Sequence, residues 1–126
     1  MTGRRITFRA GDGALEADAV IDPAGAARES GAPDAREESL RAALRQGLAG
    51  AAARGARTAA VPAAGVAGLP LQRVAELLLE EARAHLAGET SLEEIRFVLS
   101  GEPALRVFEA VQDGFRIAEQ ARRWSS

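Results

Sequence analysis

One stretch of the chain limits its fold more than any other: an apolar strand leads through a glycine-bearing turn into a long periodic helix. The strand is Ala59–Val61, Gly65 and Gly68 mark the turn, and the helix begins at Pro70 and continues past Leu86. A short, fully apolar strand followed by such a helix is typical of a parallel sheet that is buried on both faces. Backbone N–H groups at a strand end and a helix start then point to one place, which suits an anionic group such as phosphate.

Strand and helix patterns alternate along the rest of the chain. We expect strands at residues 4–10, 17–21, 58–61 and 94–99, and helices at residues 33–54, 70–87, 103–111 and 115–124. This alternation predicts an α/β fold with three layers, in which helices cover both faces of a small, mostly parallel sheet of about four strands. With 126 residues, we expect one domain over 1–126, of which 113–126 form a C-terminal helical extension.

Composition excludes several kinds of site. Cysteine is absent and His85 is the only histidine, so the chain offers neither disulfides nor a multi-histidine metal site, and we expect no metal and no cofactor. A net charge of −2 gives no electrostatic reason to bind nucleic acid. No apolar run is long enough for a membrane span and no secretory signal opens the chain, so we expect a cytoplasmic protein. All 16 basic residues are arginine, which fits a GC-rich coding sequence and, more weakly, a thermophile.

Three collinear stretches resemble the macro domain, a family whose best-known members bind ADP-ribose. Ile6–Asp12 and Ala17–Gly25 are similar to the family's opening strand, its Gly-Asp-Ile turn and its Asp-Ala-Ile-Val-Asn-Ala-Ala-Asn strand. Val61–Pro70 is similar to its phosphate loop and the helix start that follows. Ile95–Leu99 together with Phe108 resembles its last strand and the next helix. The resemblance implies a macro-like fold and a binding module for ADP-ribose or a related adenine nucleotide.

The resemblance also implies roles for individual residues. Asp12 matches the family's adenine-contacting aspartate, and Asp22 matches the asparagine that contacts the distal ribose. Gly25 matches the asparagine on which hydrolytic members depend. Backbone amides of four residues would hold phosphate: Gly65, Val66, Ala67 and Gly68. Each position also has a purely structural interpretation, because Asp and Gly are the ordinary residues of tight turns and strand ends.

Departures from the family pattern concern function more than fold. The chain contains no asparagine, and where the family's Gly-Gly-Gly loop would follow it runs through Ala26–Gly31. The phosphate loop after Gly65 is about two residues shorter than the family's. Two strands of the family's central region have no counterpart before the third strand. These losses favour binding without hydrolysis, while leaving open whether the chain is an enzyme.

The missing strands would leave 17–21 at the edge of the sheet, where an uncovered strand can pair with another chain. The segment Ala24–Arg54 could cover this edge, or a second copy could dock there; Phe115–Trp124 could serve either role. The alternative function is therefore a ligand-free macro-like fold that acts as a structural or interaction subunit, expected to be a homodimer through the sheet edge or the C-terminal helix.

Overall fold

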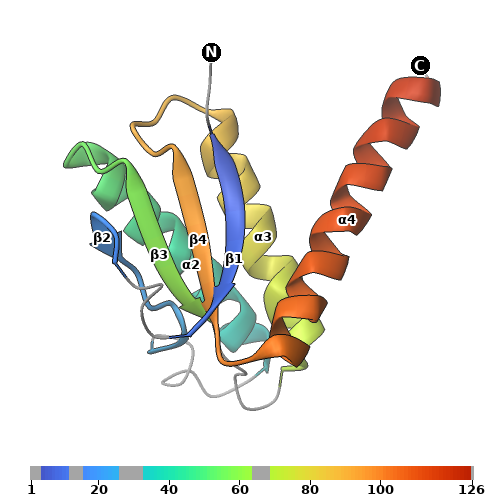
Figure 1. Cartoon of the computed structure of the whole chain (residues 1–126), viewed down its shortest axis with the longest axis horizontal. Coiled ribbons are helices and arrows are strands. Elements are labelled where there is room, and N and C mark those ends of the chain that lie inside the picture. Colours follow the sequence, from blue (N-terminus) through green and yellow to red (C-terminus); the bar gives the residue numbers. More distant parts are fainter. Residues whose placement is uncertain (1–3, 12–15, 26–32, 64–68, 126) are drawn as a thin grey trace.

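The computed structural model describes residues 4–11, 16–25, 33–63 and 69–125 (Figure 1). Its elements follow the predicted alternation of strands and helices. The strands are β1 (Arg5–Ala10), β2 (Ala19–Val20), β3 (Thr58–Ala63) and β4 (Glu94–Leu99), and the helices are α2 (Pro33–Ala53), α3 (Leu71–Ala87) and α4 (Glu102–Ser125).

The strands form one sheet in the order β1-β4-β3-β2, and every neighbouring pair is parallel. β4 is central and pairs over its whole length with both β1 and β3. The predicted α/β class and the small parallel sheet of four strands are therefore confirmed. β2 lies at one edge, as the sequence predicted for the strand within 17–21.

One face of the sheet forms the core. Ile95, Phe97 and Leu99 alternate along β4 toward the helices, and the side chains of all three are buried. Phe97 lies against Phe108 of α4 with ring centroids 5.5 Å apart, and Phe8 of β1 lies 6.1 Å from each of them. From α2, three fully buried leucines complete this core: Leu40, Leu44 and Leu48.

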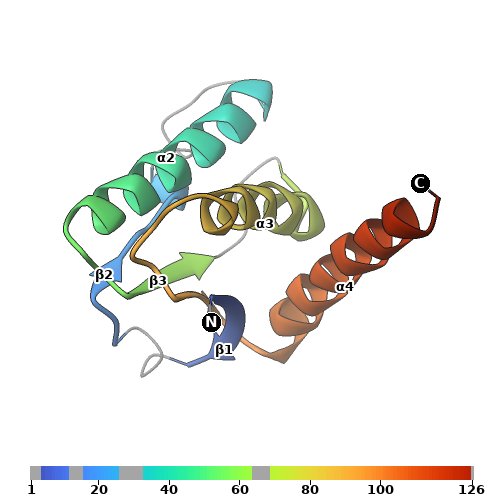
Figure 2. The same cartoon turned by 90° about the horizontal axis from the view of Figure 1, so that it is seen from above.

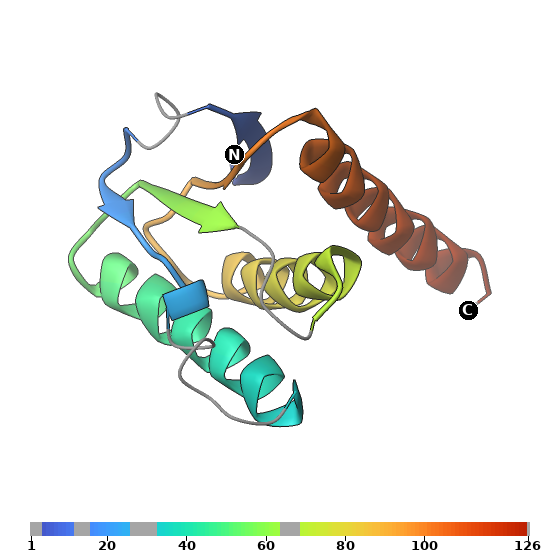
Figure 3. The ribbon, with the colours of Figure 1, turned by 90° about the horizontal axis from the view of Figure 1, so that it is seen from below.

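The described helices lie on one side of the sheet. Figures 2 and 3 show α2, α3 and α4 on the same side of the sheet, so the described residues form two layers. The opposite face of the strands carries a charged hydrogen-bonded network. Thr7 of β1 donates to the carboxylate of Glu94 at 2.6 Å, and the Arg96 guanidinium donates to the same carboxylate at 3.0 Å. A charged network of this kind does not bury the apolar stripe of a helix.

α4 is one continuous helix, whereas the sequence predicted two segments at 103–111 and 115–124. Gly114 lies between the two predicted segments, and glycine costs a helix about 1 kcal/mol relative to alanine. Packing across the glycine outweighs that cost. Val111 and Phe115 pack against the core, and the Arg83 guanidinium of α3 lies 5.2 Å from the centre of the Phe115 ring.

β2 is shorter than predicted, and hydrogen bonds beyond both of its ends keep the chain beside β3. The Asp18 carboxylate accepts hydrogen bonds from the N–H groups of Arg57 (2.9 Å) and Thr58 (3.4 Å), just before β3. The N–H of Ile21 donates to the carbonyl of Ala60 at 2.9 Å, so the chain stays beside β3 after β2 ends.

Candidate functional site

Because all four strands are parallel, their carboxyl ends lie at one edge of the sheet. In Figure 1 this is the lower edge, and α2, α3 and α4 also begin there. Open parallel sheets bind ligands in the crevice outside the carboxyl ends of their strands. The helix starts add backbone N–H groups and the positive ends of three helix dipoles to the same region.

Asp22 lies at this edge, directly after β2. Its Oδ1 accepts a hydrogen bond from the N–H of Ala24 at 3.1 Å, which closes a tight turn, and its side chain is exposed. Pro23 and Ala24 are buried behind it. The carboxylate is therefore fixed by the backbone while it faces solvent at the strand end. The surroundings of Asp22 fit both the structural and the ligand-binding interpretation. Its carboxylate closes a turn, and it lies where a ligand hydroxyl could donate to it.

Gly25 follows this turn and is half-buried. A Cβ added at Gly25 would meet no heavy atom within 4 Å. Local space within the described residues therefore does not require glycine here, and the position leaves open volume beside Asp22.

The other predicted site residues, Asp12 and the four residues Gly65, Val66, Ala67 and Gly68, lie outside the described residues. Their flanking residues place both loops. Gly11 ends β1 with φ +104°, a left-handed conformation that favours glycine. Ala63 ends β3 and Leu69 is buried, so both loops leave the sheet at its carboxyl edge.

The start of α3 is open to an anion. Pro70 is its N-cap and makes no side-chain capping hydrogen bond, and the first turn holds no acidic residue. Proline has no side chain that could accept from the first N–H groups of the helix. The phosphate site predicted from the sequence just before this helix, Gly65–Gly68, lies outside the described residues.

Arg73, in the first turn of α3, was missed by the sequence reasoning. Its guanidinium donates to both carboxylate oxygens of Glu37 in α2, at 2.9 and 3.0 Å, and to Glu76 at 3.1 Å. The hydrogen bond from Arg73 holds the pKa of the Glu37 carboxyl below its usual value. This fork ties α2 to α3 close to the carboxyl edge, so Arg73 is a positioning residue. No local sequence signal links two residues so far apart in the chain.

One further titratable group, His85, lies toward the opposite edge of the sheet. His85 lies near the end of α3, and its Nε2 is 2.7 Å from the Thr90 hydroxyl; burial, and then the charge of Arg4, lower its pKa. Among the described residues, no cluster of acidic or histidine side chains could hold a metal ion. None of the described helices is both long and apolar enough to span a membrane.

Comparison with known proteins identifies the fold. No protein-family model matches the sequence, and no curated protein matches it. Among solved structures, a Trypanosoma brucei macrodomain superposes with a TM-score of 0.66 at 17% identity, over 83% of this chain and 65% of that one. The Oceanobacillus iheyensis macrodomain with ADP superposes with a TM-score of 0.62 at 19% identity, over 72% of this chain and 48% of that one. The chain thus has a reduced, divergent macrodomain fold and spans about half the length of the Oceanobacillus protein.

Proposed function

We propose that this chain is a binding module for ADP-ribose or a related adenine nucleotide, without hydrolase activity. The observation that carries the proposal is the meeting of parallel strand ends with the uncapped start of α3 at one edge of the sheet. Solved structures of the same fold include an Oceanobacillus macrodomain with ADP and a Trypanosoma macrodomain in complex with ADP-ribose, the latter at 18% identity and a TM-score of 0.60.

Each part of the nucleotide has a candidate partner. The diphosphate would lie against backbone N–H groups of Gly65–Gly68 and the start of α3, where the helix dipole favours negative charge. Asp12 would accept from the exocyclic amine of adenine. The exposed Asp22 carboxylate would accept from ribose hydroxyls, with the space beside Gly25 admitting the sugar. Hydrolysis is not proposed, because the chain has no asparagine to take the place of the family's catalytic one.

Calorimetric titration with ADP-ribose, ADP and AMP tests this proposal. We expect a binding heat that Gly65→Glu abolishes, because a carboxylate in the phosphate loop repels the anion. Gly88→Glu is the matched control: Gly88 has an extended backbone at the other end of α3, and a Cβ there meets its nearest heavy atom at 3.8 Å. No heat with any of the three ligands would refute nucleotide binding. Equal loss in both variants would assign the effect to charge or folding.

A second candidate function is favoured by surfaces that the protomer leaves exposed. Val20 on the edge strand is 55% exposed, and on α4 Ile117 and Trp124 are 66% and 88% exposed. Apolar side chains grouped on one element mark contact surfaces. We therefore also propose a homodimeric interaction subunit, whether or not a nucleotide is bound.

A further inference from the structure

α4 carries two apolar stripes, one packed against the core and one that is mostly exposed. The inner stripe, which includes Phe108, Val111 and Phe115, packs against the core. The outer stripe recurs at alternating steps of three and four residues: Val107, Ala110, Gly114, Ile117, Ala121 and Trp124. Steps of three and four are the spacing of a seam between two paired helices. The spacing continues over the entire length from Val107 to Trp124, about 26 Å at 1.5 Å per residue.

The outer stripe is exposed and shaped for close approach. All of its members except the half-buried Val107 are exposed. Three of them, Ala110, Gly114 and Ala121, are small, and small residues let helix backbones come close together. A Cβ added at Gly114 would meet nothing within 4 Å, so the protomer itself gives no packing reason for a glycine there.

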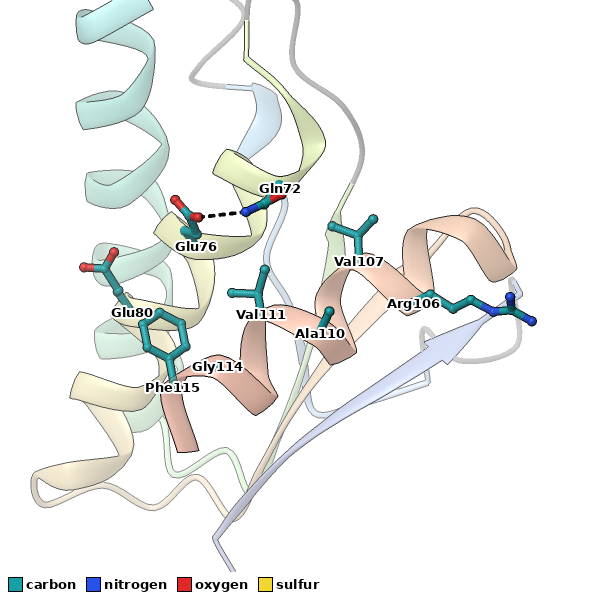
Figure 4. A pocket seen from close by; sticks show the side chains of 9 residues that line it. All are labelled: Gln72, Glu76, Glu80, Arg106, Val107, Ala110, Val111, Gly114 and Phe115. Atoms are coloured by element: carbon teal, nitrogen blue, oxygen red, sulfur yellow. Dashed lines mark hydrogen bonds between the residues drawn. The ribbon is translucent and has the colours of Figure 1, made fainter. Parts of the chain in front are cut away.

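A groove of about 630 Å³ runs beside this stripe, between α3 and α4. Figure 4 shows its two walls: Gln72, Glu76 and Glu80 project from α3, and Val107, Val111 and Phe115 from α4. The α4 wall is apolar except for Arg106, and the α3 wall carries Gln72 and two acidic side chains. Val107, Ala110 and Gly114 belong to both the groove and the outer stripe.

We propose that α4 pairs antiparallel with α4 of a second copy, so that the C-terminal half of each helix fills the groove of the other protomer. In this register Ile117 packs on the partner's Gly114, Ala121 on the partner's Ala110, and Trp124 on the partner's Val107. The three contacts repeat about a two-fold axis between residues 114 and 117, as a symmetric dimer requires. This inference specifies the interface of the proposed homodimer and is independent of nucleotide binding.

Charge selects the antiparallel direction. Arg122 and Arg123, both exposed, flank Trp124 at the end of α4. Antiparallel pairing brings them to the partner's groove, which carries Glu76 and Glu80 as well as Arg106; within their own protomer the two carboxylates also pair with Arg73 and Arg41. A parallel, in-register pair would instead set the two arginines against the same two arginines, and like charges at close range disfavour that arrangement. A tryptophan in the groove also removes a large aromatic surface from water, about 150–250 Å² per side chain.

Light scattering and sedimentation over a range of concentrations test the interface with three variants. We expect wild type to dimerise, and Ile117→Glu to raise the dimer dissociation constant at least tenfold. Val20→Glu is the matched control, because it places the same charge on the other large exposed aliphatic side chain, in β2. Gly114→Gln separates an effect on the helix from an effect on the dimer. It should make the protomer more helical, since glycine is a poor helix former, and still weaken the dimer.

Cysteine cross-linking tests the register, and the absence of native cysteine makes it unambiguous. Ala110→Cys combined with Ala121→Cys should form dimers under mild oxidation. Ala121→Cys alone should not, because the two copies of residue 121 would lie about 16 Å apart along the helix axes. Efficient cross-linking of the single variant would indicate a parallel pair and overturn the proposal.

The outcomes distinguish a failure of the α4 interface from a failure of the proposed homodimer on which it rests. A dimer that Val20→Glu dissociates and Ile117→Glu does not would overturn the α4 interface and keep the homodimer. A wild-type monomer at all concentrations would overturn both. The calorimetric result for nucleotides is measured on the same variants and does not depend on either.

Discussion

Replacing Glu94 with glutamine tests the charged network on the face of the sheet opposite the described helices. Its side chain is 7% exposed, and Glu94 is the only buried charged residue among those described. Its carboxylate accepts from the Thr7 hydroxyl at 2.6 Å and from two nitrogens of Arg96 at 3.0 and 3.2 Å, and Arg5 lies 3.6 Å away. The network joins β1 to β4 at the amino end of the strands.

The expected loss follows from these contacts. Hydrogen bonds to charged groups contribute about 1.5–3 kcal/mol each, and glutamine retains one accepting oxygen. Its amide would turn N–H donors toward the donors of Arg96, which is 17% exposed. We expect Glu94→Gln to lower the free energy of unfolding by about 2–4 kcal/mol at pH 7. Denaturant unfolding followed by circular dichroism measures this change.

The pH dependence of the free energy of unfolding tests whether the charge of Glu94 causes the loss. Burial alone raises the pKa of Glu94, but the hydrogen bonds from Arg96 and Thr7, with the charges of Arg96 and Arg5, bring it below its usual value of 4.5. A carboxyl whose pKa is lowered by folding stabilises the native state above its unfolded pKa, and the benefit is lost as the pH falls through the folded pKa. The difference between wild type and Glu94→Gln should therefore shrink at acidic pH.

A matched control and two results test whether the network and the charge of Glu94 stabilise the sheet. Glu93→Gln changes the neighbouring exposed carboxylate and should alter stability by less than about 0.5 kcal/mol. If Glu94→Gln behaves like Glu93→Gln at pH 7, the network does not stabilise the sheet. If the loss is the same at acidic pH as at pH 7, the charge of Glu94 is not its source.

Three further substitutions test the packing. A Cβ at Gly47 would lie 2.5 Å from Cγ2 of Ile21, so Gly47→Ala should cost about 1–3 kcal/mol in unfolding experiments despite its better helix propensity, and should become favourable in an Ile21→Ala background. Gly50→Ala, whose nearest neighbour is an Arg54 nitrogen at 3.6 Å, should stabilise α2 by up to about 1 kcal/mol instead. Phe108→Ala should cost about 3–5 kcal/mol by thermal or denaturant unfolding, since its ring packs against Phe8 and Phe97, and an unchanged midpoint would contradict this core.

Elements with a strong internal pattern were predicted well from sequence. β4 has its predicted bounds, 94–99, and its apolar residues Ile95, Phe97 and Leu99 recur at the two-residue period of a strand. α3 agrees within one residue at its start, because proline and glycine mark its two ends and its apolar residues recur at helical spacing. The predicted edge position of β2 is also confirmed, although its length is not.

Features that depend on distant partners were not predictable in this way. The continuity of α4 through Gly114 depends on contacts with Arg83 and with the core, and local propensity pointed to a break. The pairing of Glu94 with Thr7 is invisible along the sequence. At the site, Asp22 and Gly25 lie at the predicted edge, while the roles of Asp12 and of Gly65–Gly68 remain proposals.

The central place of β4 has a consequence for the order of folding. β1 is made first and finds its hydrogen-bonding partner only in β4, with Arg5 opposite Glu94. β3 likewise pairs with β4 on its inner side. During synthesis, most of the chain must therefore emerge before the sheet can close, and Ile6 and Phe8 have no apolar surface to cover them until then. The strand that organises the finished molecule is the last of the four to be made.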